Sequence, residues 1–363
     1  MKKRAGFFVG IVAVVAIAVI AAIAVVDGRE ISHDKPVVKI GVSLPLSGQF
    51  VFASDGMRAV IAVFQEDLAK RSDLKNRYEF ILEDNAWNSR NILAAANKLL
   101  RADRVDAVIY FGSIVGRITA PLASGAGIVN MGVCVSEIGI ADGDLSFMIT
   151  TTPEDEAKLL ASKIKHKYKN IAIVGMNESS AIKTVEAIFE EFYEGQYKQY
   201  IVNQDERDFR AIVRQIRNQG PDALVIILYS PTLDIFIRQL REGGMGYVPL
   251  YSTHFFSAIA DFSVLEGAQF AGIAGMRSDL YDRVFARTHG KAHDLCTGYI
   301  YDGAALLVAA FENAGGKSAA GYLRQLKKFD GPALGKATQS GRGFFTVPPV
   351  WHVIKNGKPV AKE

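Results

Sequence analysis

The feature that most constrains this chain is a regular alternation of short apolar, β-rich runs with amphipathic segments. Residues 37–42 form the first β-rich run, and apolar side chains then recur at helical spacing between Met57 and Leu68. The pattern continues and predicts further strands at residues 78–82, 105–110, 128–131, 171–174, 223–228 and 250–254. Strands that alternate with helices form parallel sheets covered on both faces, so the chain is predicted to be an α/β protein.

The alternation falls into two series, and the second begins near Pro153. Two series predict two similar lobes, for which 363 residues suffice, because a domain usually contains about 100–200 residues. Ligands of open parallel sheets bind beyond the carboxyl ends of the strands. The natural position for a site is therefore the cleft between the two lobes.

The first 28 residues have the pattern of an export segment. A basic stretch, Lys2-Lys3-Arg4, precedes an uncharged apolar run from Gly6 to Val26. As a helix, this run would reach roughly 30 Å, the thickness of a bilayer core. Residues 1–28 are therefore predicted to be a signal peptide or an uncleaved signal anchor, and the two alternatives stay open. Basic residues stay in the cytoplasm, so the rest of the chain is expected to be periplasmic or otherwise extracytoplasmic. If uncleaved, the segment would hold it to the cytoplasmic membrane.

Charge and motifs exclude several classes of function. The net charge of +4 falls to +2 without the first 28 residues, which is too small to indicate a nucleic-acid partner. The chain has no phosphate-binding glycine loop and no His-Glu-x-x-His pattern, so no enzyme activity, metal or cofactor is predicted. Whether Cys134 and Cys296 form a disulfide is left open by the sequence.

Five segments together carry a resemblance to a known family. They are KIGVSLPLSG at 39–48, EDN at 83–85 with AAANKLL at 94–100, VDAVI at 105–109, DF at 208–209 with QGPDALV at 219–225, and YDGA at 301–304. In order and spacing they resemble the type I periplasmic solute-binding proteins, especially the leucine/isoleucine/valine-binding branch. The resemblance extends from about Val37 to Pro359.

This resemblance implies a domain organisation and a partner. Two Rossmann-like lobes would be joined by a three-strand hinge. Lobe 1 would comprise residues 37–150 plus 278–330, and lobe 2 residues 151–277 plus 331–360. In such proteins a ligand closes the lobes, and the closed form docks on the membrane permease subunits of an ABC transporter.

The resemblance also implies a carboxylate-binding region in lobe 1, built from hydroxyls and backbone N–H groups. Ser113 is the expected hydroxyl donor, although Ile114 also fits the family's serine position. In the next loop, Gly132 would offer its N–H, Cys134 falls near a family threonine, and Ser136 would replace the lost hydroxyl. A helix-capping role for Ser113 and core packing for Cys134 are the structural alternatives.

The remaining candidate residues surround the rest of the ligand. Phe52 lies where the family often has a cleft aromatic, and Tyr229 resembles a tyrosine that faces the ligand. His254 stands where amino-acid binders often place an acid for the ammonium group, and an imidazole is a poor partner for an ammonium ion. Glu178 and Asp302 are the candidate replacements.

The sequence thus predicts a non-enzymatic solute-binding component of an ABC transporter. Its ligand is either an apolar amino acid with an altered ammonium site, or a compound without an amine, such as a small carboxylate, an aromatic acid or an amide. A ligand sensor that acts through a separate signalling partner is the alternative, because one fold serves several functions.

Overall fold

The computed structural model describes residues 35–192, 195–289, 296–315 and 318–362. The predicted signal or anchor segment, with its apolar helix, lies outside the described residues. Residues 37–363 form a compact unit of their own. In the part of the chain that is described, no helix combines the length and the apolar character that a membrane span requires.

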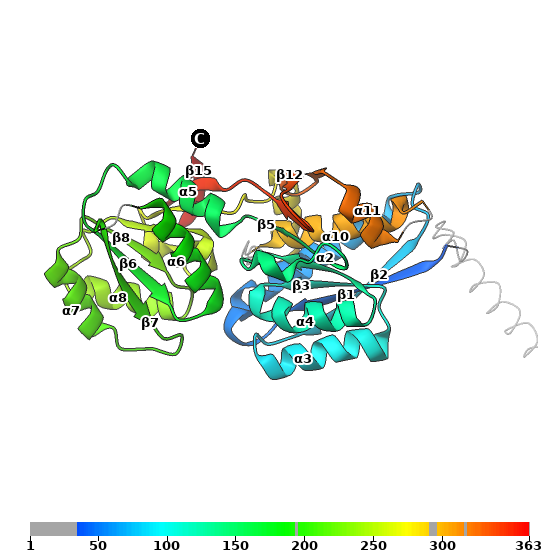
Figure 1. Cartoon of the computed structure of the whole chain (residues 1–363), viewed down its shortest axis with the longest axis horizontal. Coiled ribbons are helices and arrows are strands. Elements are labelled where there is room, and N and C mark those ends of the chain that lie inside the picture. The colour runs from blue at the N-terminus through cyan, green and yellow to red at the C-terminus, as the bar shows by residue number, and fades with distance from the viewer. Residues whose placement is uncertain (1–34, 193–194, 290–295, 316–317, 363) are drawn as a thin grey trace, which may run out of the picture. The chain divides into compact units, whose positions relative to one another are not determined.

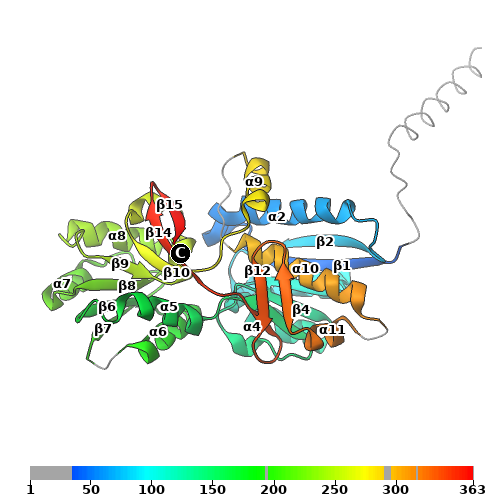
Figure 2. The same ribbon diagram turned by 90° about the horizontal axis from the view of Figure 1, so that it is seen from above.

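The first of two sheets has eight strands in the order β11-β12-β13-β5-β4-β3-β1-β2 (Figures 1 and 2). Their bounds are β1 Val37–Leu44, β2 Arg77–Asp84, β3 Ala107–Phe111, β4 Val129–Val133, β5 Ser146–Thr150, β11 Lys328–Gly331, β12 Gly335–Gln339 and β13 Phe344–Thr346. Strands β1 to β5 and β13 pair in parallel, whereas β12 pairs antiparallel with both of its neighbours.

Helices cover both faces of this sheet. Helices α2 (Val51–Ala69) and α10 (Thr297–Asn313) lie on one face, and α3 (Ser89–Asn97) and α4 (Ser113–Gly125) lie on the other (Figure 2). The remaining elements are η1 Gly48–Phe50, η2 Lys98–Asp103, η3 Ile138–Ile140, α9 Ser278–Arg287 and α11 Ala319–Gln325. Every residue of β3, β4 and β5 is buried, as expected for strands that are covered on both sides.

The second sheet has seven strands in the order β15-β14-β10-β9-β8-β6-β7. The strands are β6 Ile171–Met176, β7 Tyr197–Val202, β8 Ala223–Ile227, β9 Leu250–Ser252, β10 Gln269–Gly272, β14 Val350–Lys355 and β15 Lys358–Lys362. Its helices are α5 Pro153–Ile164, α6 Ser179–Glu191, α7 Arg210–Gln219 and α8 Thr232–Glu242, with short turns η4 His254–Ala258 and η5 Phe262–Leu265. Helices α5 and α6 pack together on one face (Figure 2).

The predicted fold is confirmed: two α/β lobes are joined where the chain crosses after β5, after β10 and after β13. A buried hydrogen bond connects the crossing after β5 to the crossing after β13. The Thr151 hydroxyl donates to the carbonyl of Val347 at 2.8 Å and also contacts the Tyr299 hydroxyl on α10. The hinge is therefore tied to the core of the first lobe.

The last crossing comes later in the chain than the sequence suggested. Residues from 331 onward were expected in lobe 2, but β12 and β13 belong to the first sheet, and the chain crosses only after Thr346. The reason is a buried carboxylate on α10. Asp302 accepts the N–H groups of Ala333 and Leu334, both at 2.9 Å, and so holds the β11–β12 turn against the first lobe.

Candidate functional site

A cavity lined by residues of both lobes lies at the carboxyl ends of the parallel strands. The centre of a water-sized sphere can occupy about 60 Å³ of it. Its lining comes from the segments that follow β1, β2, β3, β4, β6, β8 and β9, together with the last residue of β3 and Cys296 just before α10. Parallel strands end at one edge of each sheet, and the fold therefore gathers these segments around one space.

Aromatic rings form most of the apolar wall. They are Phe50, Trp87 and Phe111 from the first lobe and Tyr229 and Phe255 from the second. Phe50 packs edge-on against Trp87, with ring centres 4.7 Å apart, and lies 5.7 Å from the ring of Tyr229. Tyr229 in turn stacks on Phe255 at 6.0 Å. These spacings are those of favourable aromatic pairs, so the rings also hold the two lobes against each other.

Local backbone geometry explains how Trp87 reaches the cavity. The Asn85 side chain accepts the Trp87 N–H at 3.0 Å, and Ala86 and Trp87 both have positive φ angles. The indole then packs on Gly112, whose φ is 78°, at the start of α4. A Cβ at Gly112 would lie 2.5 Å from the indole, so glycine is required for this contact.

The start of α4 supplies the polar groups of the first lobe. Ser113 is the first helical residue, and its hydroxyl oxygen accepts the N–H groups of Ser136 at 3.1 Å and Glu137 at 3.2 Å. The N-cap position is occupied by Gly112, so Ser113 does not cap the helix with its side chain. It fixes the loop after β4 instead. Its O–H and the unpaired N–H groups of the first helical turn remain as donors beside the cavity.

Glu178 is the carboxylate among the described residues that line the cavity. It caps α6: one oxygen accepts the N–H groups of Ser180 at 3.0 Å and Ala181 at 3.4 Å, and the other accepts the Ser179 hydroxyl at 3.0 Å. These donors are neutral. No cationic side chain of the described residues forms an ion pair with it.

Tyr229 presents a buried hydroxyl that lacks a hydrogen bond. The side chain is 5% exposed, and no described residue hydrogen-bonds its oxygen. Burial raises the pKa of the phenol, and the negative charge of Glu178 raises this pKa further, while the polar groups of Trp87 and Gln49 lower it in part. The hydroxyl therefore stays protonated. A buried unpaired hydroxyl is costly, so this group is available to an occupant of the cavity.

His254 is held by a carboxylate that the sequence did not reveal. The predicted strand 250–254 ends at Ser252, and His254 begins the turn η4. Its Nδ1 lies 2.7 Å from one oxygen of Glu156, and its backbone N–H donates to the other at 3.2 Å. Glu156 is fully buried. Burial raises the pKa of its carboxyl, and the neighbouring imidazole opposes that rise. His254 is thus already paired.

A disulfide forms part of the cavity wall. Cys134 follows β4, Cys296 precedes α10, and the two are bonded with their Cα atoms 6.2 Å apart. Both cysteines have positive φ angles, which are uncommon for residues with a side chain. The sequence left the pairing open. The bond links the loop after β4 directly to the start of α10.

Hydrogen bonds cross between the lobes at the rim of the cavity. Gln49 donates to the carbonyl of Ser230 at 3.1 Å and accepts from the Gln204 amide at 3.0 Å. The Ser180 hydroxyl donates to the Ser136 hydroxyl at 2.8 Å. Because each of these contacts joins a loop of the first lobe to a loop of the second, they belong to an arrangement in which the lobes are closed on each other.

The structure brings together most of the residues predicted from the sequence. The cavity is lined by Ser113, Ile114, Cys134, Glu178, Tyr229 and His254. Ser136 lies next to it and bonds across the lobes. Gly132 lies inside β4, where its neighbours are Tyr110 and Val135, and neither it nor Phe52 lines the cavity. Asp302 holds the β11–β12 turn and also does not line the cavity. The roles of these residues in ligand binding stay predictions.

Several lining residues were not identified from the sequence. They are Phe50, Trp87, Phe111, Gly112, Ser180, Phe255, Ala258 and Cys296. Phe111 ends β3, and most of the others lie within a few residues after a strand, whereas Phe50 ends the turn η1 and Cys296 precedes α10. Choosing all residues just beyond predicted strands would have included most of them. Phe50, which ends η1, lines the cavity, whereas the expected Phe52 lies in the first turn of α2 and does not.

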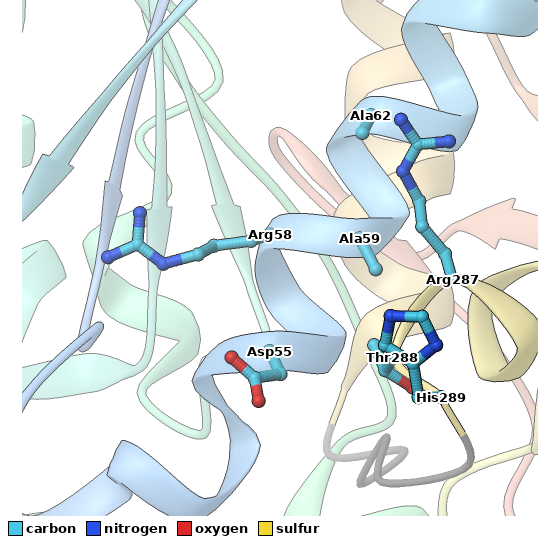
Figure 3. Close-up of a pocket in the computed structure, with 7 residues that line it drawn as sticks. All are labelled: Asp55, Arg58, Ala59, Ala62, Arg287, Thr288 and His289. Carbon is cyan, nitrogen blue, oxygen red and sulfur yellow. The ribbon is translucent and has the colours of Figure 1, made fainter.

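A second hollow lies between α2 and the end of α9 (Figure 3). It is larger, at about 440 Å³, and the side chains of Asp55, Arg58, Arg287 and His289 that line it are exposed. Figure 3 shows Arg58 extending away from Arg287 and His289. Arg287 already pairs with Glu66. These groups do not converge, and the hollow is not the candidate site. Within the described ranges, no cluster of His, Cys, Asp and Glu could hold a metal ion.

Comparison with known proteins is consistent with this geometry. The chain is similar in structure to the leucine-binding protein LivK from Thermotoga maritima, with 20% identity and a TM-score of 0.78 over 90% of this chain and 98% of that chain. It is also similar to LivJ from Streptococcus pneumoniae in complex with isoleucine, with 17% identity and a TM-score of 0.75 over 90% of this chain and 99% of that chain. No curated protein sequence matches the chain.

A Rhodopseudomonas palustris solute-binding protein in complex with 4-hydroxybenzoate is similar too, with 18% identity and a TM-score of 0.76 over 90% of this chain and 96% of that chain. At such low sequence identity, the structural similarity shows the fold and does not identify the ligand of this chain. The family model described as periplasmic binding protein matches residues 37–348, from the first strand to just beyond β13. This chain therefore belongs to the periplasmic binding protein family, and its two-lobed fold is that of the type I members.

Proposed function

We propose that this chain is the extracytoplasmic solute-binding component of an ABC transporter and that it holds a small ligand in the cavity between its lobes. The observation that carries the proposal is the cavity itself. Both lobes line it, hydrogen bonds close its rim, and a buried Tyr229 hydroxyl inside it has no hydrogen-bond partner in the described part of the chain. Such a site binds and releases a solute by hinge motion and needs no reactive group.

The ligand is an apolar amino acid or a related small carboxylate. Donors at the start of α4, including the Ser113 hydroxyl, suit a carboxylate group, and the aromatic wall suits an apolar body. Structurally similar proteins have been solved with isoleucine and with 4-hydroxybenzoate, so both ligand classes occur on this fold. Permease subunits in the membrane would receive the closed, loaded form.

Thermal denaturation of the full-length chain tests the proposal. The chain is heated with single amino acids and with small organic acids. A true ligand at a hundredfold excess over its dissociation constant adds about 2.7 kcal/mol to the free energy of unfolding. We expect at least one compound to raise the melting temperature in a concentration-dependent way. If none of them does, the chain is not a carrier of these solutes.

A further inference from the structure

The charge distribution around the cavity narrows the class of ligand, on the condition that the proposed function holds. Among the described residues that line it there is no lysine or arginine. The imidazole of His254 is paired with the buried Glu156. The carboxylate of Glu178 is therefore a charge at the cavity wall without a counter-ion among these residues.

Glu178 retains the capacity to accept a further hydrogen bond. One of its oxygens accepts two backbone N–H groups of α6, and from the described residues the other accepts only the Ser179 hydroxyl. A carboxylate oxygen has two lone pairs, so this second oxygen has one left for a ligand donor. An ammonium group would satisfy it and would also neutralise the charge.

Tyr229 provides an independent observation at the same place. Its hydroxyl is buried and has no hydrogen-bond partner among the described residues, and Tyr229 lines the same cavity as Glu178. A phenolic oxygen can accept a hydrogen bond from an ammonium group. Aromatic rings, including those of Phe50 and Trp87, line the cavity, and the face of such a ring carries a negative potential that can attract a cation.

We propose that the Glu178 carboxylate and the Tyr229 hydroxyl bind the ammonium group of an apolar α-amino acid, in place of the acidic side chain expected at position 254. His254 is not available for this role, because Glu156 already holds it. An acid without an amine would bring a second negative charge close to Glu178 in a space of low dielectric, which is unfavourable. A zwitterionic amino acid avoids this repulsion.

Isothermal titration calorimetry of the full-length chain with matched ligands tests the inference. The pairs are L-leucine with 4-methylpentanoate and L-phenylalanine with 3-phenylpropanoate, which differ by the amine, and benzoate is added as an aromatic acid. For the native chain we expect the fitting amino acid to bind at least about tenfold more tightly than its amine-free partner, because a hydrogen bond to a charged group is lost.

The variant Glu178→Gln should remove this preference. Glutamine keeps an oxygen that can accept the N–H groups of α6, so the helix start is retained while the charge is lost. We expect amino-acid affinity to fall at least about tenfold and the affinity for the amine-free acid to hold or rise. Asp261→Asn is the matched control. Asp261 likewise accepts a backbone N–H at 2.9 Å and a serine hydroxyl at 2.8 Å, but it does not line the cavity.

The variant Tyr229→Phe separates binding from folding. Its removed hydroxyl has no partner among the described residues, so the melting temperature of the ligand-free chain should hold or rise while amino-acid affinity falls. The inference is overturned if benzoate or an amine-free acid binds the native chain as tightly as the amino acids, or if Glu178→Gln weakens both members of a pair equally. Failure of every solute in the thermal screen would instead overturn the proposed function.

Discussion

At the scale of single residues, Asp302 is the carboxyl group whose pKa most clearly makes the stability of the fold depend on pH. Burial raises its pKa to about 6, although the N–H groups of Ala333 and Leu334 and the charge of Arg277 act against the rise. The folded chain thus holds the Asp302 proton more tightly than the unfolded chain. The stabilisation from this group is full below pH 4 and is lost as the pH rises through about 6.

This pKa predicts a measurable difference between the native chain and an Asp302→Asn variant, which cannot titrate there. The difference in unfolding free energy, native minus variant, should decrease by about 2 kcal/mol between pH 4 and pH 7. Denaturant unfolding at a series of pH values measures it. The exposed Asp205 of the second lobe, changed to Asn, is the control. A difference that stays constant or increases with pH would show that Asp302 is not buried as described.

At the scale of elements, the bond between Cys134 and Cys296 connects the loop after β4 to the start of α10 across the cavity wall. A cross-link between positions 162 residues apart strongly restricts the unfolded chain. Reduction by dithiothreitol should therefore lower the unfolding free energy by about 2–4 kcal/mol. The doubly substituted chain, Cys134→Ser with Cys296→Ser, should show the lower value without reductant and should not respond to it. A native chain that is insensitive to reductant contradicts this bond.

The same scale shows why some elements could be predicted and others could not. Strands such as β8 are short, continuous apolar runs, and burial on both faces requires that composition, so the sequence reveals them. Strands β11 and β12 lie at the sheet edge and have exposed residues, and their assignment to the first lobe depends on the contact of Asp302 with their turn. Such a long-range contact has no local signal.

The same difference between local signals and long-range contacts applies to the residues of the candidate site. Ser113, Glu178 and Tyr229 were expected from the family resemblance, and each lies just after a strand that the sequence pattern predicts. The pairing of His254 with Glu156 could not be read from the sequence, because 98 positions separate the two and only the packing of α5 beside β10 and η4 brings them together. Without knowledge of that pairing, His254 is interpreted as a residue that replaces the acid of an ammonium-binding site. With it, the imidazole is part of the second lobe's structure.

At the scale of the whole molecule, the cavity exists because two lobes meet. Phe50 and Tyr229 contact each other across it, and Gln49 bonds to residues of the second lobe at its rim. A ligand between the lobes adds contacts to both and therefore favours the closed arrangement over an open one. Ligand binding and closure of the two lobes are therefore coupled in a single equilibrium.

The fluorescence of Trp87 tests this central claim most directly. The chain has two tryptophans, so a Trp351→Phe variant of the full-length chain leaves Trp87, in the cavity wall, as the reporter. A solute that raises the melting temperature is titrated in, and we predict a saturable change in Trp87 emission with the same dissociation constant that calorimetry gives. If the solute stabilises the chain while Trp87 emission stays unchanged, the ligand binds outside the interlobe cavity.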